Sequence, residues 1–326
     1  MFDLNALRLA AHTVHQTLAP TPQLAWPLLT ERMGCTVWVK HENHTPTGAF
    51  KVRGGLLYVQ GLLAREPGTT GLVTATRGNH GQSLALAARS VGLPIHIVVP
   101  QGNSVEKNAA MRALGATVIE CGQDFDEARA EAAALAQNRQ WHLVPAFHPD
   151  LIRGVATYAL ELLEAVEELD TVYVPIGMGS GICGLIQTRD LLGLNTEIVG
   201  VVSSHADAFA QSFEQGRVVC TDSARTFADG LACRQPLPEA LDIIRKGAAR
   251  IIRVTDQQIA HGIRVYHETT HNTAEGAGAA ALAGLISEQS RQQGRRVALI
   301  LSGANIDRQL YAWVLADRAG TAAQPH

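Results

Sequence analysis

Short apolar, β-branched runs alternate with longer stretches of helical periodicity through almost the whole chain. Each run has the length and composition of a strand buried in a parallel sheet. They are Val37-Trp-Val-Lys40, Gly71-Leu-Val-Thr-Ala75, Ile95-His-Ile-Val-Val99, Thr117-Val-Ile-Glu120, Thr171-Val-Tyr-Val174, Ile198-Val-Gly-Val-Val202, Ile251-Ile-Arg-Val254 and Val297-Ala-Leu-Ile-Leu301. This alternation predicts an α/β fold with parallel sheets covered by helices on both faces, in which ligands bind at the carboxyl ends of strands.

Recognisable helix starts lie between these runs. Asp124 with Glu127, and Thr255 with Gln258, have the spacing of a capping box, and Ser104 suits the start of a helix that runs to Leu114. Helices are therefore expected to begin next to these residues.

Length and composition exclude several classes of protein. A chain of 326 residues predicts about two domains, and its net charge of -3 comes without a basic block that would bind nucleic acid. No apolar run is long enough to span a bilayer, and Met1 to Gln16 lacks a signal-peptide core. The 5 scattered cysteines form no Cys-x-x-Cys motif, which indicates reduced thiols. We therefore expect a cytoplasmic protein without a membrane or nucleic-acid partner.

One lysine stands where a strand pattern runs into a helix pattern, in His44-Thr-Pro-Thr-Gly-Ala-Phe-Lys51-Val-Arg-Gly-Gly55. A lysine at such a position loses part of its solvation, which lowers its pKa and frees the amine to attack a carbonyl. Most lysines are solvated surface charges, so a catalytic role for Lys51 needs support from other segments.

The first supporting segment follows the run at 71–75 and reads Thr76-Arg-Gly-Asn-His-Gly-Gln82. It opens a helix, whose first backbone N–H groups favour an anion. Asn79 adds a neutral amide that can hydrogen-bond a phenolate or a carboxylate. The alternative interpretation is an ordinary capped turn.

The second segment follows the run at 171–174 and reads Ile176-Gly-Met-Gly-Ser-Gly-Ile-Cys-Gly184. Its glycines allow several N–H groups to face one phosphate, and Ser180 can add a hydroxyl. Gly179-x-Gly181-x-x-Gly184 also matches the dinucleotide fingerprint, so a nicotinamide enzyme is an alternative. That alternative expects an acidic residue at the end of the next strand, where this chain has Val202-Ser-Ser204.

The third segment follows the run at 297–301 and reads Ser302-Gly-Ala-Asn-Ile-Asp307. A serine there can hydrogen-bond a heteroaromatic nitrogen without supplying a full charge, although a simple strand-to-helix turn is also possible. An amine, a phosphate cradle, an amide and a hydroxyl together match the functional groups of pyridoxal 5'-phosphate.

With these segments in place, the chain resembles the fold-type II pyridoxal-phosphate enzymes of the threonine/serine dehydratase and serine racemase family. The similarity extends from about Pro20 to Leu315. The matching segments, in the family's order, are Thr47-Gly-Ala-Phe-Lys51, Gly78-Asn-His-Gly-Gln82, Gly177-Met-Gly-Ser180, Ala228-Asp-Gly230, Glu275-Gly-Ala-Gly278 and Ser302-Gly-Ala-Asn305.

The resemblance implies a role for each matching residue. Lys51 would be the catalytic residue, binding the cofactor as a Schiff base, and Phe50 would pack beside the ring. Asn79 would bind the phenolic oxygen and Ser302 the pyridine nitrogen. The other cofactor contacts would come from Gly177, Met178, Gly179 and Ser180 at the phosphate and from Gly230 and Glu275 around the ring. The substrate carboxylate would lie on Thr76, Arg77, Gly78, Asn79 and His80.

The resemblance also implies a two-domain fold-type II architecture, each domain a mostly parallel sheet flanked by helices. Residues 1–50 and 147–326 would form the large cofactor-binding domain, and residues 51–146 a small mobile domain that closes over it. We further expect a homo-oligomer, either a dimer or a tetramer. Residues 317–326 have the small and polar composition of a disordered tail.

The implied activity is that of a dehydratase, or ammonia-lyase. A neutral hydroxyl opposite the ring nitrogen stabilises a carbanion less than a carboxylate would, which favours elimination of a β-substituent. Lys51 would remove the α-proton, the β-hydroxyl would leave, and hydrolysis would give a 2-oxo acid and ammonia. L-threonine and L-serine are the expected substrates, with 3-hydroxyaspartate and phenylserine as alternatives.

Two departures from the family pattern affect this prediction. Arg77 stands where serine racemases carry a second serine as acid and base, and a guanidinium with a pKa above ~12 is a poor base. Racemisation therefore loses its second proton carrier, which favours the dehydratase over serine racemase, the alternative activity. Arg77 can instead pair with a substrate carboxylate or turn to solvent. The family's divalent-cation site uses acidic residues where this chain has Val202 and Ala208, so no metal is expected.

A function of another class is also open. His267-Glu-Thr-Thr-His271 matches the His-Glu-x-x-His motif of zinc metallohydrolases, although no convincing third ligand follows it. A protein that carries pyridoxal phosphate without catalysis is a further alternative.

Overall fold

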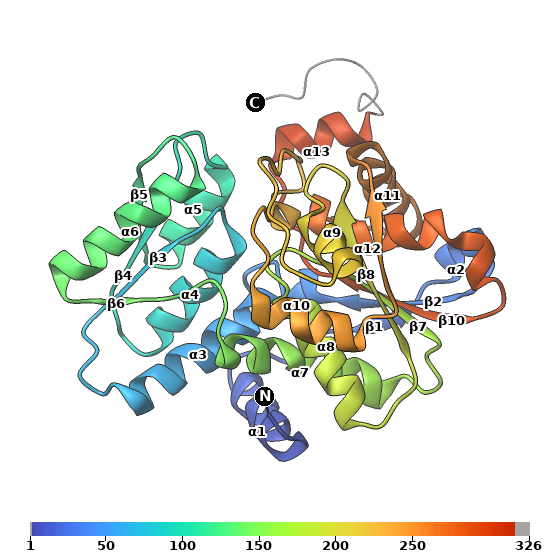
Figure 1. Cartoon of the computed structure of the whole chain (residues 1–326), viewed down its shortest axis with the longest axis horizontal. Helices are drawn as coiled ribbons and strands as arrows, with labels where there is room; N and C mark the ends of the chain where they lie inside the picture. The colour runs from blue at the N-terminus through green and yellow to red at the C-terminus, as the bar shows by residue number, and fades with distance from the viewer. Residues whose placement is uncertain (1, 317–326) are drawn as a thin grey trace.

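The computed structural model describes residues 2–316 and contains two sheets that lie side by side (Figure 1). Six strands form one sheet in the order β1-β2-β10-β7-β8-β9, and four form the other in the order β5-β4-β3-β6. Every paired strand is parallel to its neighbour except β1, which runs antiparallel to β2 at the sheet edge. The predicted α/β fold of mostly parallel sheets flanked by helices is confirmed.

All eight strands expected from the sequence are present, and two short strands were missed. The strands are β1 Gln23–Ala25, β2 Thr36–His41, β3 Leu72–Ala75, β4 Ile95–Val99, β5 Thr117–Glu120, β6 His142–Leu143, β7 Thr171–Pro175, β8 Glu197–Ser203, β9 Arg250–Val254 and β10 Arg296–Leu301. The missed strands, β1 and β6, have 3 and 2 residues. Runs this short are too brief to show a strand periodicity.

The helices follow the strands in alternation. They are α1 Leu4–His15, α2 Pro27–Met33, α3 Lys51–Arg65, α4 Asn79–Ser90, α5 Val105–Ala113, α6 Phe125–Arg139, α7 Pro149–Ala165, α8 Ser180–Leu191, α9 Ala208–Gln215, α10 Pro238–Gly247, α11 Asp256–Thr270, α12 Gly276–Ser287 and α13 Arg308–Leu315, with the 3-10 helices η1 Glu42–His44, η2 Asp229–Leu231 and η3 Gln289–Gln292.

The helix starts expected from the sequence are present, with one difference in detail. Thr255 and Gln258 form a reciprocal capping box at α11, and Ser104 accepts from the backbone N–H of Lys107 at α5. Asp124 caps α6, but the Glu127 carboxylate accepts from the backbone N–H of Gln123 rather than from that of Asp124. The capping box at α6 is therefore not reciprocal, because the Glu127 carboxylate bonds the residue before the N-cap instead of the N-cap itself.

Helix α3 joins the two halves of the molecule, because it packs on both α4 and α7. Its crossing with α7 is tight: a Cβ atom added at Gly154 would lie 2.4 Å from the Arg53 carbonyl oxygen. The lysine singled out in the sequence, Lys51, is the first residue of α3. It therefore lies where the two halves meet.

We call β3 to β6 with α4, α5 and α6 the four-stranded unit, and the larger sheet with α7 to α13 the six-stranded unit (Figure 1). The division into domains at residues 50/51 and 146/147 stays a prediction. The tail expected at residues 317–326 lies outside the described residues. Within residues 2–316, none of the helices combines the length and the apolar character that crossing a membrane requires.

Candidate active site

The segment before α3 is tied to the end of strand β10. The backbone N–H of Phe50 donates to the Ser302 carbonyl oxygen at 3.0 Å, and Ala49 forms an isolated bridge with Gly303. These contacts hold Lys51 beside the third loop predicted from the sequence, although about 250 residues separate the two segments.

Lys51 has the properties of a reactive amine. Its side chain is only partly exposed, and its nitrogen lies 5.4 Å from the centre of the Phe50 ring. Desolvation lowers the pKa of Lys51 to about 8, although the negative charge of Glu275 opposes the shift. The ammonium makes no hydrogen bond within residues 2–316. The neutral, nucleophilic form of this amine is therefore more populated near neutral pH than in an ordinary lysine.

The second loop forms a cradle at the start of α8. Gly179 precedes the helix with a φ of 95°, a left-handed conformation that favours glycine, and Ser180 is the buried first residue of the helix. A Cβ atom at Gly177 would lie 2.1 Å from the Gly230 carbonyl oxygen, so only glycine fits there. The N–H groups at this helix start can bind an anionic phosphate.

Asn79 opens α4 and is fixed by two neighbours. Its amide nitrogen donates to Oε1 of Glu275 at 2.6 Å, and its oxygen accepts from the amide of Asn305 at 2.8 Å. An amide nitrogen has two N–H groups, so one remains for a ligand. The role predicted for Asn79 at a phenolic oxygen is compatible with this geometry.

Glu275 is a buried carboxylate next to Lys51. Desolvation raises its pKa well above the usual range of a glutamate, although the Lys107 ammonium, 3.8 Å from its Oε2 atom, opposes the shift. Oε2 has no hydrogen-bond partner among the residues that the structure describes. Lys107 itself donates to Asp229 at 2.6 Å, and Asp229 further raises the pKa of Glu275.

The sequence did not indicate Lys107, Asp229 or Asn305 as site residues. Asp229 lies in the family-matching segment at residues 228–230 and Asn305 in the one at residues 302–305, so membership of a matching segment was a usable signal. Lys107 lies in the first turn of a helix on the other unit, and its spacing gave no sign of a contact with Glu275.

The loop at residues 76–80 lies against the same cluster. The Thr76 hydroxyl accepts from the backbone N–H of Gly78 at 3.0 Å, and a Cβ atom at Gly78 would lie 2.5 Å from Cδ of Lys107. Desolvation, with the charge of Lys51, lowers the pKa of buried His80 to about 3. One ring nitrogen of His80 bonds the Pro145 carbonyl, and the other, Nε2, has no partner within residues 2–316.

Arg77 is the exception in this loop, because its side chain is exposed. The pKa of the exposed Asp124 carboxylate is lowered mainly by a hydrogen bond from the Glu127 backbone, and the charges of Arg234 and Arg77 add to that shift. Arg77 therefore acts on Asp124, outside the buried cluster.

The assembled groups fit pyridoxal phosphate. The cradle of Gly177, Met178, Gly179 and Ser180 suits the phosphate, Lys51 offers an amine and Asn79 a remaining N–H. Ser302 is a buried hydroxyl at the end of β10, and its neighbour Gly303 would collide with Glu275 if it carried a Cβ atom. His80 and Glu275, which carry the unpartnered atoms, both lie close enough to Lys51 to interact with its charge.

The His-Glu-x-x-His segment does not have the geometry of a zinc peptidase. Helix α11 ends at Thr270, and His271 has a left-handed φ of 52°. Glu268 forms an ion pair with Arg32 at 2.6 Å, and His267 contacts the Tyr311 hydroxyl. No group of three or more metal-ligating side chains occurs within residues 2–316. The metallohydrolase alternative therefore lacks both a free base and a third ligand in this part of the chain.

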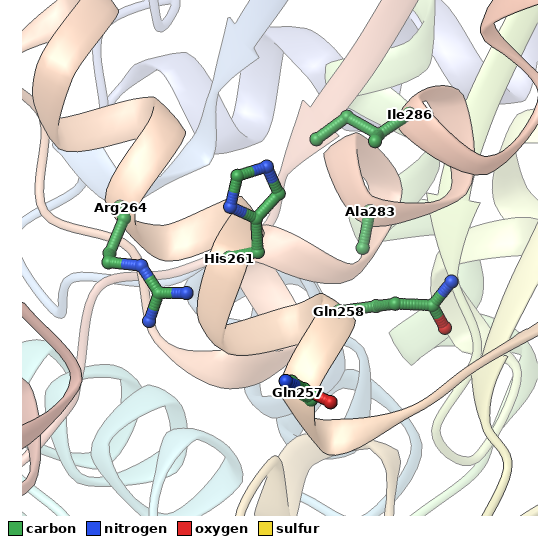
Figure 2. A pocket seen from close by; sticks show the side chains of 6 residues that line it. All are labelled: Gln257, Gln258, His261, Arg264, Ala283 and Ile286. Carbon is green, nitrogen blue, oxygen red and sulfur yellow. The ribbon is translucent and has the colours of Figure 1, made fainter. Parts of the chain in front are cut away.

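An open pocket of about 260 Å³ lies away from these residues, on helices α11 and α12 (Figure 2). Figure 2 shows the six side chains that line it: Gln257, Gln258, His261, Arg264, Ala283 and Ile286. None of them belongs to the cluster around Lys51, so this pocket is not the candidate active site.

Comparison with known proteins agrees with the cluster. Residues 14–303 match the family model of the pyridoxal-phosphate dependent enzymes. The chain is 32% identical over 297 residues to the biosynthetic L-threonine dehydratase of Pasteurella multocida, covering 90% of this chain and 58% of that protein. It therefore spans less than two thirds of that relative's length.

A second relative matches over nearly its whole length. The L-threo-3-hydroxyaspartate ammonia-lyase of Saccharomyces cerevisiae is 30% identical over 310 residues, which cover 95% of each chain. Among solved structures, the processed form of threonine deaminase isoform 2 from Solanum lycopersicum superposes with a TM-score of 0.89 at 28% identity, covering 98% of this chain and 95% of that one.

Proposed function

The chain belongs to the family of pyridoxal-phosphate dependent enzymes, as its matching segments predicted, and we propose that it deaminates a β-hydroxy amino acid by eliminating water and then adding water back to the enamine, with a net loss of ammonia. The proposed substrates are L-threonine and L-serine, and the proposed products are 2-oxo acids. Relatives named threonine dehydratase or deaminase support this choice. The observation that carries the proposal is the Lys51 amine, whose pKa is lowered and which interacts with buried Glu275, next to Phe50, whose backbone N–H is bonded to Ser302.

The family's cofactor is pyridoxal 5'-phosphate, and the residues present suit each part of it. Lys51 would bind its aldehyde carbon as a Schiff base, and the N–H groups of residues 177–180 would hold its phosphate. Asn79 would donate to the phenolic oxygen and Ser302 would face the ring nitrogen. When bound, the cofactor supplies an electron sink that stabilises negative charge at the substrate α-carbon.

The protein's own residues bind the substrate and move the protons. Backbone N–H groups of residues 76–80 would bind the α-carboxylate. The Lys51 amine, once free, would accept the α-proton, because its lowered pKa allows it to gain and lose a proton near neutral pH. The β-hydroxyl leaves as water, and hydrolysis of the remaining enamine releases ammonia and the 2-oxo acid.

L-threo-3-hydroxyaspartate is a second candidate substrate. The yeast relative named for that activity covers 95% of this chain, and Arg77 gives the substrate loop an exposed guanidinium that matches a second carboxylate. Because its side chain is exposed, Arg77 would be able to turn toward such a substrate.

The test is an assay of keto acid and ammonia with threonine, serine, 3-hydroxyaspartate and phenylserine, each in both enantiomers. We expect turnover of L-threonine and L-serine. A preference for 3-hydroxyaspartate that disappears in Arg77→Gln would favour the second candidate. Interconversion of serine enantiomers without ammonia release would favour a racemase, and cofactor binding without any turnover would favour a carrier.

A second experiment tests the covalent link. The lysines of this chain are Lys40, Lys51, Lys107 and Lys246. Borohydride reduction of the yellow protein followed by peptide mass analysis should find the cofactor on Lys51. A reduced cofactor on any other lysine would contradict the proposal.

We also propose that the enzyme is a cytoplasmic homo-oligomer, a dimer or a tetramer, with a small domain at residues 51–146. The cysteines support a reducing compartment, because all 5 are free thiols in the structure. Light scattering during size-exclusion chromatography measures the oligomeric state.

A further inference from the structure

The first turn of α5 reaches from the four-stranded unit to the six-stranded unit. The Ser104 hydroxyl donates to the Asp307 carboxylate, and the Glu106 carboxylate accepts from the backbone N–H of Arg308 at 3.0 Å. These two contacts hold α5 against the start of α13, at the edge of the site.

Lys107, the next residue of α5, extends further into the site. Only 8% of its side chain is exposed, and its methylene groups run along Gly78 of the substrate loop. Its ammonium lies 2.6 Å from Asp229 and 3.8 Å from Oε2 of Glu275, both on the six-stranded unit. Lys107 is therefore a buried charge that bridges the two units at the residues around the cofactor site.

We propose that Lys107 is a positioning residue of the reaction: its ammonium holds the Glu275 carboxylate, and through it the Asn79 amide, in the place that catalysis requires. Glu275 accepts from Asn79 at 2.6 Å, so a displaced carboxylate would release the amide. This inference rests on the proposed function, because it assigns the elimination as the reaction that Lys107 supports.

The charges around Glu275 come from several elements. Lys107 faces it from α5, Asp229 from η2 and Lys51 from α3, while Asn79 on α4 donates a hydrogen bond. Removing the Lys107 charge raises the pKa of Glu275 further, because only the charge of Lys51 and the hydrogen bond from Asn79 then offset its burial and the charge of Asp229. Removing the Asp229 charge lowers that pKa, because a repulsive neighbour is lost.

The two partners of one ion pair thus give opposite shifts, which provides the test. The experiment titrates the protonated carboxyl band of Glu275 by difference infrared spectroscopy in the cofactor-loaded protein, with Glu275→Gln to assign the band. We expect the midpoint to rise by about one pH unit or more in Lys107→Met and to fall in Asp229→Asn. A pair that only joins the two units would shift the midpoint in neither variant, or in the same direction in both, and either result would overturn the proposal.

Kinetics supply the second readout. Lys107→Met should lower kcat by about 10- to 100-fold, the loss typical of a misplaced group, with KM changed by less than about 3-fold. Lys107→Arg keeps the charge and should recover kcat to within about 10-fold of the native enzyme.

Arg234→Gln is the matched control. Arg234 pairs with Asp126 across the same two units, but it does not contact Glu275. The kcat of Arg234→Gln should stay within about 2-fold of the native value. A loss equal to that of Lys107→Met would overturn the proposal, because any ion pair between the two units would then have the same effect.

The outcomes separate this inference from the proposed function. If the native enzyme releases no ammonia from any β-hydroxy amino acid, the proposed function fails while the infrared midpoints still decide the role of Lys107. If Lys107→Met does not fold, Lys107→Gln takes its place, and an unchanged Glu275 midpoint together with an unchanged kcat in that variant overturns the proposal.

Discussion

Two clusters, each with two cationic and two acidic side chains, lose solvation on folding, but the pKa of a glutamate shifts in opposite directions in the two. The core ion cluster consists of Lys40, Glu42, Arg53 and Glu161, and the site cluster of Lys51, Lys107, Asp229 and Glu275. Both are neutral in sum if every group is ionised. Lys51 and Arg53 even lie two residues apart on α3.

In the core ion cluster almost every polar atom is paired. Arg53 donates to Glu42 at 2.7 and 2.9 Å and to Glu161 at 2.6 and 2.9 Å, and Lys40 donates to Glu161 at 2.6 Å. Although desolvation acts in the opposite direction, the bonds and charge of Arg53 and the charge of Lys40 hold the pKa of Glu161 at about 2. Arg53 and Glu161 therefore keep their charges at physiological pH, although burial lowers the pKa of Lys40.

In the site cluster the pairing is incomplete. Lys51 has no hydrogen bond for its ammonium and Glu275 has an unpartnered oxygen within residues 2–316, and burial shifts both pKa values toward neutrality. Burial opposes ionisation in both clusters; hydrogen-bonded partners outweigh it at Arg53 and Glu161, whereas at Lys51 and Glu275 the partners are too few to do so. Catalysis needs groups that can change their proton state, and perturbed groups of this kind concentrate at functional sites.

Lys51→Met should produce the largest effect and should separate function from stability. We expect kcat to fall by about 10⁴-fold or more, because in the proposed function Lys51 both attaches the cofactor and accepts the α-proton. Since its buried ammonium has no partner to lose and its pKa is lowered, the free energy of unfolding should stay the same or rise. Keto-acid release and urea unfolding measure the two quantities. A large loss of stability would remove the contrast between the clusters.

Arg53→Met should have the opposite character. Removing one partner of a buried, fully bonded ion pair costs about 3–5 kcal/mol, because Glu42 and Glu161 stay buried without it. Urea unfolding checks the loss. The double variant Arg53→Met/Glu42→Gln should recover part of it, since one unpaired carboxylate is removed as well. No recovery would mean that packing of the long side chain, rather than charge, stabilises the core ion cluster.

Two glutamates should respond to pH in opposite directions. The pKa of Glu161 is depressed, so its stabilisation is present above its ordinary value of 4.5 and is lost as pH falls toward about 2. Glu161→Gln should therefore cost about 3 kcal/mol at pH 7, from about 1.4 kcal/mol per pKa unit, and less at pH 3.

The pKa of Glu275 is raised, so its ionisation in the folded protein opposes folding as pH rises above 4.5. Between pH 5 and pH 8 the free energy of unfolding of Glu275→Gln should exceed that of the native protein by about 1–3 kcal/mol, because that is what an unsatisfied buried group costs. Urea unfolding across this range measures both variants. Parallel pH profiles for the two glutamates would show that the clusters do not differ in the way described.

The smallest effect is expected at the surface and sets the scale for the others. Arg8 and Glu164 form an ion pair at 3.2 Å with 61% and 45% of their side chains exposed. Arg8→Gln should change the free energy of unfolding by less than about 1 kcal/mol and leave kcat unchanged. A cost near that of Arg53→Met would mean that burial is not what gives the core ion cluster its strength.

Much of this molecule was predictable from local sequence. The eight longer strands were found from their apolar runs, whereas β1 and β6 were missed because a strand of three or two residues has no readable period. Ser104 and Thr255 predicted their helix starts because capping depends on residues within one turn. His267 and His271 misled for the same local reason: the motif assumes a continuing helix, and α11 ends between them.

The sequence by itself determined the strand runs, the helix caps, and the segments that carry Lys51, Asn79, the glycine-rich loop at 176–184 and Ser302, because these depend on residue type and short spacing; Glu275 was expected only from the family resemblance. Only the tertiary structure brought Lys107 beside Glu275 and left the Arg77 side chain exposed. The distances that decide a pKa or an ion pair join residues far apart in the chain, and desolvation exists only once those segments have packed together.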